Sequence, residues 1–298
     1  MLWIFLALIA TFSWAWANII DKTLRTKYLK DSIALTASFG IYSIIFSFIL
    51  FLFIGMPSIP FWNLVAALMA GFFLAYGVIP YVKALSIEEA SRVVPLWHLS
   101  PIFTLILAVI FLNEILTPIR YTAFAFILLG GILISTRKIG MVFHISPAVY
   151  LMLLSSFLVS ISDVLLKFAY STQIFWQTFL VFDFGIGLGS ISLFIIKNSR
   201  KNFSKAVLSY KKVFLLLLFF SVLTGFIGHI FYNNAILLGP VTLVSVFVSF
   251  QSLFVLLIAT FLSAKFPLFL KEAIDIKTIG IKLIAIAFMA LGLFLLAL

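Results

Sequence analysis

The chain has 298 residues, of which 64% are hydrophobic and only 10% are charged, and Phe alone occurs 36 times. A soluble domain carries about 25% charged residues, so this composition excludes a water-soluble globular protein. The net charge of +11 resides in short connections, which argues against nucleic acid as a partner, and the absence of cysteine excludes disulfides, thiol catalysis and cysteine-based metal sites.

Ten mostly apolar stretches follow one another along the chain, and about 20 apolar residues in a helix cross a bilayer core. The first stretch contains Ala15-Trp16-Ala17, which imitates a signal-peptide cleavage site. No basic residue precedes Lys22, so we interpret this stretch as a retained helix. The predicted spans lie at about 2–20, 33–54, 61–85, 92–112, 118–136, 147–167, 175–196, 213–238, 241–262 and 278–297. An all-α, multi-pass integral membrane protein follows, with the lipid bilayer as a partner.

The last five stretches repeat the first five. A shift of 151 places the third and fourth stretches on the eighth and ninth, and a shift of 145 places the first on the sixth. The matched residues are Gly77 and Gly228, Tyr81 and Tyr232, Ala84 and Ala235, Val93 and Val244, Phe103 and Phe254, Asn18 and Asp163, and Lys22 and Lys167. Five helices is an odd number, so the halves enter the membrane in opposite directions. The sequence therefore predicts two inverted five-helix repeats, 1–138 and 147–298, which are typical of secondary transporters.

Lys and Arg gather in the connections that follow odd-numbered helices, at 22–30, 137–138, 197–212 and 265–277. Basic connections stay on the cytoplasmic side. We therefore expect both termini outside, in what we take to be a prokaryotic plasma membrane.

Three segments resemble the drug/metabolite transporter superfamily, and specifically its EamA-type ten-helix members. They are 13–18 (SWAWAN) before Lys22, 84–101 with Val93-Val94-Pro95, and 111–114 (FLNE) followed by Leu116-Thr117-Pro118. The resemblance covers the whole chain and implies a central cavity, with the fifth and tenth helices peripheral. Two features depart from the family. Residues 261–265 (FLSAK) carry no Glu, and family members usually keep both termini in the cytoplasm.

Polar side chains within the spans are candidates for the transport site, because a charged group at membrane depth costs about 2.5–3.5 kcal/mol and usually faces a cavity or a partner. Asp183 and His229 lie at similar depth on antiparallel helices and could pair, as a proton or substrate site. The alternative is a structural pair, or Asp183 bonded to a neighbouring hydroxyl. Asn18 and Asp163 are candidates for substrate contact or gating, although Asp163 could simply pair with Lys167 one turn later.

The remaining candidates are aromatic or polar residues within the helices. The substrate-binding candidates are Trp14, Tyr76, Tyr81, Lys83, Trp97, His98, Tyr232, Asn233 and Gln251, and the gating candidates are Gly77, Pro80 and Gly228. Lys83 could instead snorkel to the headgroups, and the glycines could serve close helix packing. Glu114 is interpreted as a solvated carboxylate of the turn between the fourth and fifth helices.

The pattern favours a secondary transporter that moves a small polar metabolite, such as an amino acid-like solute, by alternating access and in the direction of export. Protons are a candidate coupling ion, and no cofactor, metal or enzymatic activity is expected. A flippase or transporter for a lipid-linked or nucleotide-linked sugar is the alternative, and it would need a lateral opening to lipid. A membrane-embedded enzyme is disfavoured because Glu88 and Glu89 point to different faces of a helix and no His lies beside them.

Overall fold

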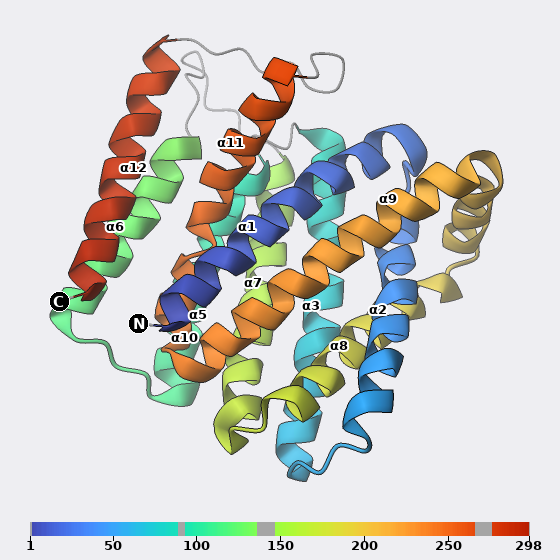
Figure 1. Ribbon diagram of the computed structural model, residues 1–298, viewed down its shortest axis with the longest axis horizontal. Helices are drawn as coiled ribbons and strands as arrows, with labels where there is room; N and C mark the ends of the chain where they lie inside the picture. The colour runs from blue at the N-terminus through green and yellow to red at the C-terminus, as the bar shows by residue number, and fades with distance from the viewer. Residues whose placement is uncertain (1, 89–92, 136–146, 266–275, 298) are drawn as a thin grey trace.

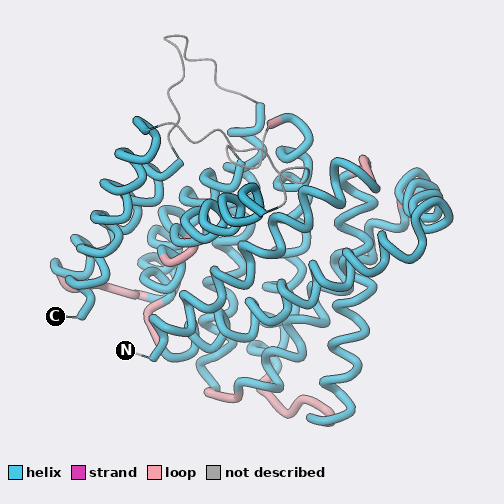
Figure 2. Tube along the Cα trace, turned by 45° about the horizontal axis from the view of Figure 1, so that its top comes forward, coloured by secondary structure: helices cyan, strands magenta, loops and turns pink. Residues whose placement is uncertain are grey.

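The computed structural model describes residues 2–88, 93–135, 147–265 and 276–297, and every element in these ranges is helical (Figures 1 and 2). The first half contains α1 (Leu2–Thr23), η1 (Leu24–Tyr28), α2 (Ser32–Ile54), α3 (Phe61–Ile87), η2 (Val94–Leu99), α5 (Ser100–Leu112) and α6 (Pro118–Ser135). The second half contains α7 (Pro147–Ala169), η3 (Tyr170–Thr172), α8 (Phe175–Ser192), η4 (Leu193–Ile195), α9 (Lys197–Leu238), α10 (Val241–Val246), α11 (Ser249–Lys265) and α12 (Ile276–Ala297).

The predicted all-α class is confirmed. Six helices are long and apolar enough to cross a membrane, namely Leu2–Tyr28, Ser32–Ile54, Phe61–Ile87, Pro147–Thr172, Phe175–Ile195 and Lys212–Leu238. Shorter apolar helices cover Ser100–Leu112, Pro118–Gly130, Val241–Val255 and Ile284–Leu295. The count of ten spans and the inverted relation of the halves stay predictions.

The connection predicted at 197–212 is in fact helical. It forms the first part of α9, which breaks at Tyr210, where φ is −132° and ψ is 24°. Phe203, Ala206 and Val207 of this part pack on the apolar cluster beneath it. Its many Lys residues suggested a loop, but they lie on the outer face of an amphipathic helix.

Glycines bring the helices of the two halves into close contact. A methyl group at Gly71 of α3 would collide with the backbone of Phe182 in α8, and one at Gly185 of α8 would collide with that of Leu68 in α3. Gly40 of α2 meets α8 in the same way, with Ser190 Cβ 2.6 Å from the position of the missing methyl group. Small residues allow this approach, which drives helix association where lipid offers no hydrophobic gain.

Two long-range pairings cross the halves at the centre of the molecule. Helix α1 runs beside α9, as Figure 1 shows, and α3 runs beside α7. Helices α6 and α12 pack on each other at one side through Gly130 and Gly292. The predicted halves are therefore interleaved, and the space between them is bounded by the central helices.

Candidate functional site

A cavity of about 200 Å³ lies between the central helices. Its lining residues come from α1, α2, α3, η2 and α5 of the first half and from α7, α8, α9 and α11 of the second, with Val248 between α10 and α11. Within the described part of the chain, α6 and α12 contribute no lining residue. This position agrees with the cavity that the family resemblance implied.

Three carboxylates line the cavity, on three different helices. Asp21 of α1, Asp163 of α7 and Asp183 of α8 have exposed fractions of only 8%, 4% and 2%. Each accepts a hydrogen bond from one hydroxyl: Asp21 from Ser221, Asp163 from Tyr232 at 2.9 Å, and Asp183 from Ser47 at 2.7 Å. The lining residues include no Lys and no Arg. Within the described ranges, none of the three carboxylates has a basic hydrogen-bond partner.

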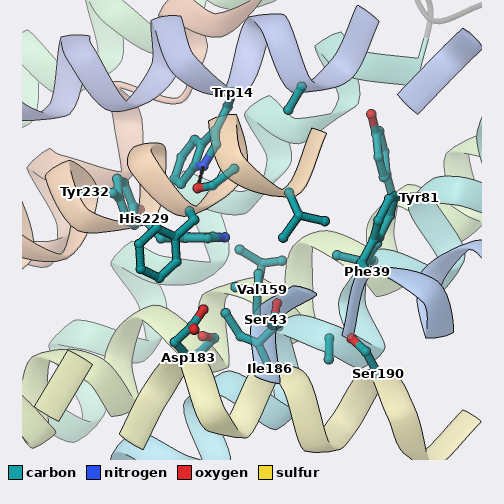
Figure 3. Close-up of a pocket in the computed structure, with 18 of the residues that line it drawn as sticks. Trp14, Phe39, Ser43, Tyr81, Val159, Asp183, Ile186, Ser190, His229 and Tyr232 are labelled. Carbon is teal, nitrogen blue, oxygen red and sulfur yellow. Dashed lines mark hydrogen bonds between the residues drawn. The ribbon is translucent and has the colours of Figure 1, made fainter. Parts of the chain in front are cut away.

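The expected pair of Asp183 and His229 is not formed, although both residues line the same cavity (Figure 3). Asp183 is bonded to the hydroxyl of Ser47, which is the alternative that the sequence left open. The ring of His229 instead packs edge-on against Trp14, with centroids 5.3 Å apart, and against Phe182 at 5.8 Å. The helical register thus turns the imidazole toward rings rather than toward the carboxylate.

The two repeat-matched tyrosines make the same contact in both halves. Tyr81 Oη donates to Asn18 Oδ1 and Tyr232 Oη donates to Asp163 Oδ2, both at 2.9 Å. All four residues line the cavity. The bond within α7 between Asp163 and Lys167 is absent, because Lys167 Nζ donates to two backbone carbonyls at the end of α9, those of Ile236 at 2.8 Å and Gly239 at 2.7 Å.

The lining positions of the first half recur in the second half at a constant shift for each helix. A shift of 145 residues relates α1 to α7, and it takes lining positions 14, 17, 18 and 21 to 159, 162, 163 and 166. A shift of 147 relates α2 to α8, and it takes 36, 39 and 43 to 183, 186 and 190. A shift of 151 relates α3 to α9, where it takes 74, 75, 78 and 81 to 225, 226, 229 and 232, and it also takes 97 and 100 to 248 and 251. Every one of these positions lines the cavity, so the two halves build equivalent walls.

Most of the predicted substrate residues meet in this cavity. They are Trp14, Asn18, Tyr81, Trp97, Asp183, His229, Tyr232, Asn233 and Gln251, together with Asp163. Tyr76 does not line the cavity, because its hydroxyl bonds Ser192 at 3.0 Å and its ring stacks on Phe72. Lys83 is exposed, as its snorkelling alternative requires. The side chain of His98 lies outside the described part of the structure.

The predicted gating residues lie where α3 and α9 cross the opposite half. Gly77 of α3 meets Val159 of α7, and its equivalent Gly228 of α9 meets Trp14 of α1. Pro80 is buried inside α3, directly before Tyr81. The glycines therefore serve close packing, and whether they also bend stays a prediction.

The sequence did not single out Asp21, Ser47 or Thr36. Asp21 stands beside Lys22, and it follows Asn18 by three residues and so shares its helix face. That spacing was the available signal. Thr36 and Ser47 carry no such signal, because Ser and Thr are common in membrane helices.

Glu114 was interpreted as a solvated turn carboxylate, and this is wrong. Its Oε2 accepts from the backbone N–H of Val241 at 2.9 Å and its Oε1 accepts from that of Thr242 at 3.0 Å. These are free N–H groups at the start of α10, where a carboxylate is stabilising. Glu114 thus connects the turn before α6 to a helix of the second half.

Apolar helices of membrane-spanning length define a multi-pass integral membrane protein, and buried polar side chains take part in lining the cavity between them. Residues 1–136 match the EamA-like transporter family. The match confirms the resemblance to the drug/metabolite transporter superfamily and supports a membrane transporter of this type.

A solved structure described only as "Crystal structure of protein" has the same fold. It is 16% identical, the similarity covers 97% of this chain and 98% of that one, and the TM-score is 0.65. Among curated proteins, none matches the chain.

Proposed function

We propose that the protein is a secondary transporter that moves a small polar metabolite by alternating access, in the direction of export across a prokaryotic plasma membrane. The observation that carries this proposal is the cavity whose two walls repeat position by position. In transporters built from inverted repeats the solute sits between the repeats near mid-membrane. Two equivalent walls can exchange roles, so that the cavity opens first to one side and then to the other.

Protons are the proposed coupling ion. A carboxylate without a basic partner in a buried site is costly when ionised, so it holds a proton or pairs with a cationic ligand. Asp183 and Asp163 meet this description, and His229 faces the same space. Release of a proton to one side would then alternate with solute binding from the other.

Alternating access can be tested without knowledge of the solute, because the native chain has no cysteine to give background labelling. Ser43 and Ser190 are equivalent cavity positions, labelled in Figure 3. In Ser43→Cys and Ser190→Cys, a membrane-impermeant maleimide added to sealed vesicles should react from either face. Labelling that occurs from one face only at both positions would contradict a carrier.

Exposed cysteines placed at Ser58→Cys and Lys201→Cys give the matched controls, since each should react from one face only. They also test the orientation. The charge distribution predicts that Lys201→Cys reacts from the cytoplasm and Ser58→Cys from outside. The reverse result would restore the usual family orientation.

A further inference from the structure

Aromatic rings line one end of the cavity, and polar groups without hydrogen-bond partners among the described residues line the opposite end. Trp14 lies against His229 and also against Tyr232, with centroids 4.9 Å apart, and Phe182 adds a further ring. This aromatic group adjoins the carboxylate of Asp163, to which Tyr232 donates, and Figure 3 shows Asp183 on the same side of the cavity as His229. Figure 3 shows Tyr81 across the cavity from His229 and Tyr232.

The far end, beside Tyr81, holds the carboxylate of Asp21, which accepts from Ser221, and two polar groups that no described residue bonds. Asn18 is 7% exposed and accepts from Tyr81, yet its Nδ2 donor has no partner. Thr36, which is 1% exposed, has a hydroxyl without a partner. Both residues line the cavity. A buried donor without a partner costs about as much as a lost hydrogen bond, so these groups point to a ligand that supplies an acceptor.

The charge of the cavity decides which ligand fits. Among the described lining residues there are three carboxylates and no Lys or Arg, so a cation finds charged partners, whereas a carboxylate on the ligand finds no cationic partner. Rings of Trp, Tyr and Phe bind cations through their faces. A zwitterionic amino acid would bring its own carboxylate into this acidic space.

We propose that the solute is a small organic amine that carries an uncharged hydrogen-bond acceptor at its other end. The ammonium group binds between Asp163, Asp183 and the adjoining rings, and the acceptor binds Asn18 Nδ2 and Thr36. This inference rests on the proposed transport function and replaces the amino acid-like solute with its amine counterpart.

Three related compounds separate the two ends of the ligand. Tyramine has the amine and a hydroxyl, tyrosine adds a carboxylate to the same skeleton, and phenethylamine lacks the hydroxyl. With the full chain in nanodiscs at one fixed pH, equilibrium competition against radiolabelled tyramine should rank them. We expect tyrosine to bind at least about tenfold more weakly than tyramine. Phenethylamine should bind about three- to tenfold more weakly.

Variants of the protein test which residues bind the ammonium group and which bind the hydroxyl of tyramine. In Asp163→Asn, tyramine should bind at least about tenfold more weakly. In Asn18→Ala, the preference for tyramine over phenethylamine should disappear. Tyr76→Phe is the control, because Tyr76 lies outside the cavity and its loss should change neither value. If Asp163→Asn does not fold, the ranking of the three compounds by the native chain still decides.

Tyrosine binding as tightly as tyramine, or the absence of binding by all three compounds, would overturn the amine assignment. The maleimide experiment stays separate from this result. If the cavity cysteines react from both faces but tyrosine binds more tightly than tyramine, the carrier function stands and the amine assignment is wrong. A chain that binds tyramine and labels from one face only loses the carrier function.

Discussion

The two walls of the cavity have equivalent positions but different charges. Where one wall carries an acidic residue or a histidine at a matched position, the other wall carries an uncharged residue. The equivalent pairs are Asp21 and Leu166, Asp163 and Asn18, Asp183 and Thr36, and His229 and Val78. Positions that serve packing or bracing, such as Gly77 and Gly228 or Tyr81 and Tyr232, are the same in both. Packing therefore constrains both walls alike, while the chemistry that distinguishes solutes and protons is divided between them.

Replacing Asp183 should have the largest effect, because it removes a titratable group that the first wall lacks. Asp183→Asn should abolish pH-driven accumulation of solute yet spare solute exchange, since an amide cannot take up and release a proton. Both are measured with purified protein in liposomes. Asp31→Asn is the matched control, because Asp31 caps α2 outside the cavity and Asn caps equally well. Accumulation that keeps its pH dependence in Asp183→Asn would remove this residue from coupling.

Exchanging the residues at one matched position should show whether the walls are interchangeable. Asp163→Asn alone makes positions 18 and 163 identical and should weaken tyramine binding at least about tenfold. The double variant Asn18→Asp with Asp163→Asn moves the carboxylate to the other wall, where Tyr81 already donates to residue 18. Because this variant loses Asn18 Nδ2 and leaves the aromatic rings at the other end, its tyramine affinity should stay at least about tenfold below the native value, by the same binding measurement. An affinity that returns to within about threefold of the native value would mean that the two walls are interchangeable and would contradict the assignment of the ligand ends.

Removing one hydroxyl from each wall should have a moderate and unequal effect. A hydrogen bond to a charged acceptor contributes about 1.5–3 kcal/mol and one to a neutral acceptor about 0.5–1.5 kcal/mol. Tyr232→Phe, which leaves Asp163 unbonded, should therefore change apparent transport affinity more than Tyr81→Phe, which leaves Asn18 unbonded. Tyr76→Phe provides the control outside the cavity. Equal values for all three variants would show that neither tyrosine acts on the solute.

The smallest effect concerns a contact outside the cavity whose carboxylate is not repeated in the sequence of the second half. Glu114 holds the start of α10, and its matched position, 151 residues later, is Lys265. Glu114→Gln keeps the shape but loses the charge, so it should cost about 1 kcal/mol and lower the melting temperature by roughly 2–4 °C. Differential scanning fluorimetry measures this, with the exposed Lys83→Gln as control. An unchanged melting temperature would mean that the charge of Glu114 contributes nothing to holding α10.

Much of the architecture could be predicted because apolar length and glycine spacing act locally along the chain. The stretches at 33–54, 61–85 and 175–196 correspond closely to α2, α3 and α8. Most of the cavity residues could also be named, because polar groups within apolar helices stand out. The hydrogen-bond partners of these residues could not be predicted. Whether Asp183 meets His229 or Ser47 depends on the rotation of α8 against α2, and no spacing along one helix reveals that angle.

The same limit explains why Asp21 and Glu114 were misjudged or missed. Both stand at helix ends, where a charge is usually solvated. Asp21 is buried because α9 crosses over it and brings Ser221, from 200 residues away, to its carboxylate. Glu114 is held because α10 begins beside it. Contacts of this kind form where helices that are distant in the sequence cross in the folded protein, and they produce no periodic pattern in the sequence.

The turn between α9 and α10 is held by hydrogen bonds from two other segments, α7 and the turn before α6. Lys167 holds the last carbonyls of α9 and Glu114 holds the first amides of α10, through four charge-assisted hydrogen bonds that span Gly239 and Pro240. These bonds tie the α9–α10 turn to α7 and to the turn before α6, so all of them must break before the α9–α10 turn can move away from both, and such bonds are about twice as strong as neutral ones. Any opening of the cavity at the α9–α10 turn therefore begins with a slow, activated step. We expect the turnover rate of the carrier to be limited there, by the release of a latch rather than by the binding of solute.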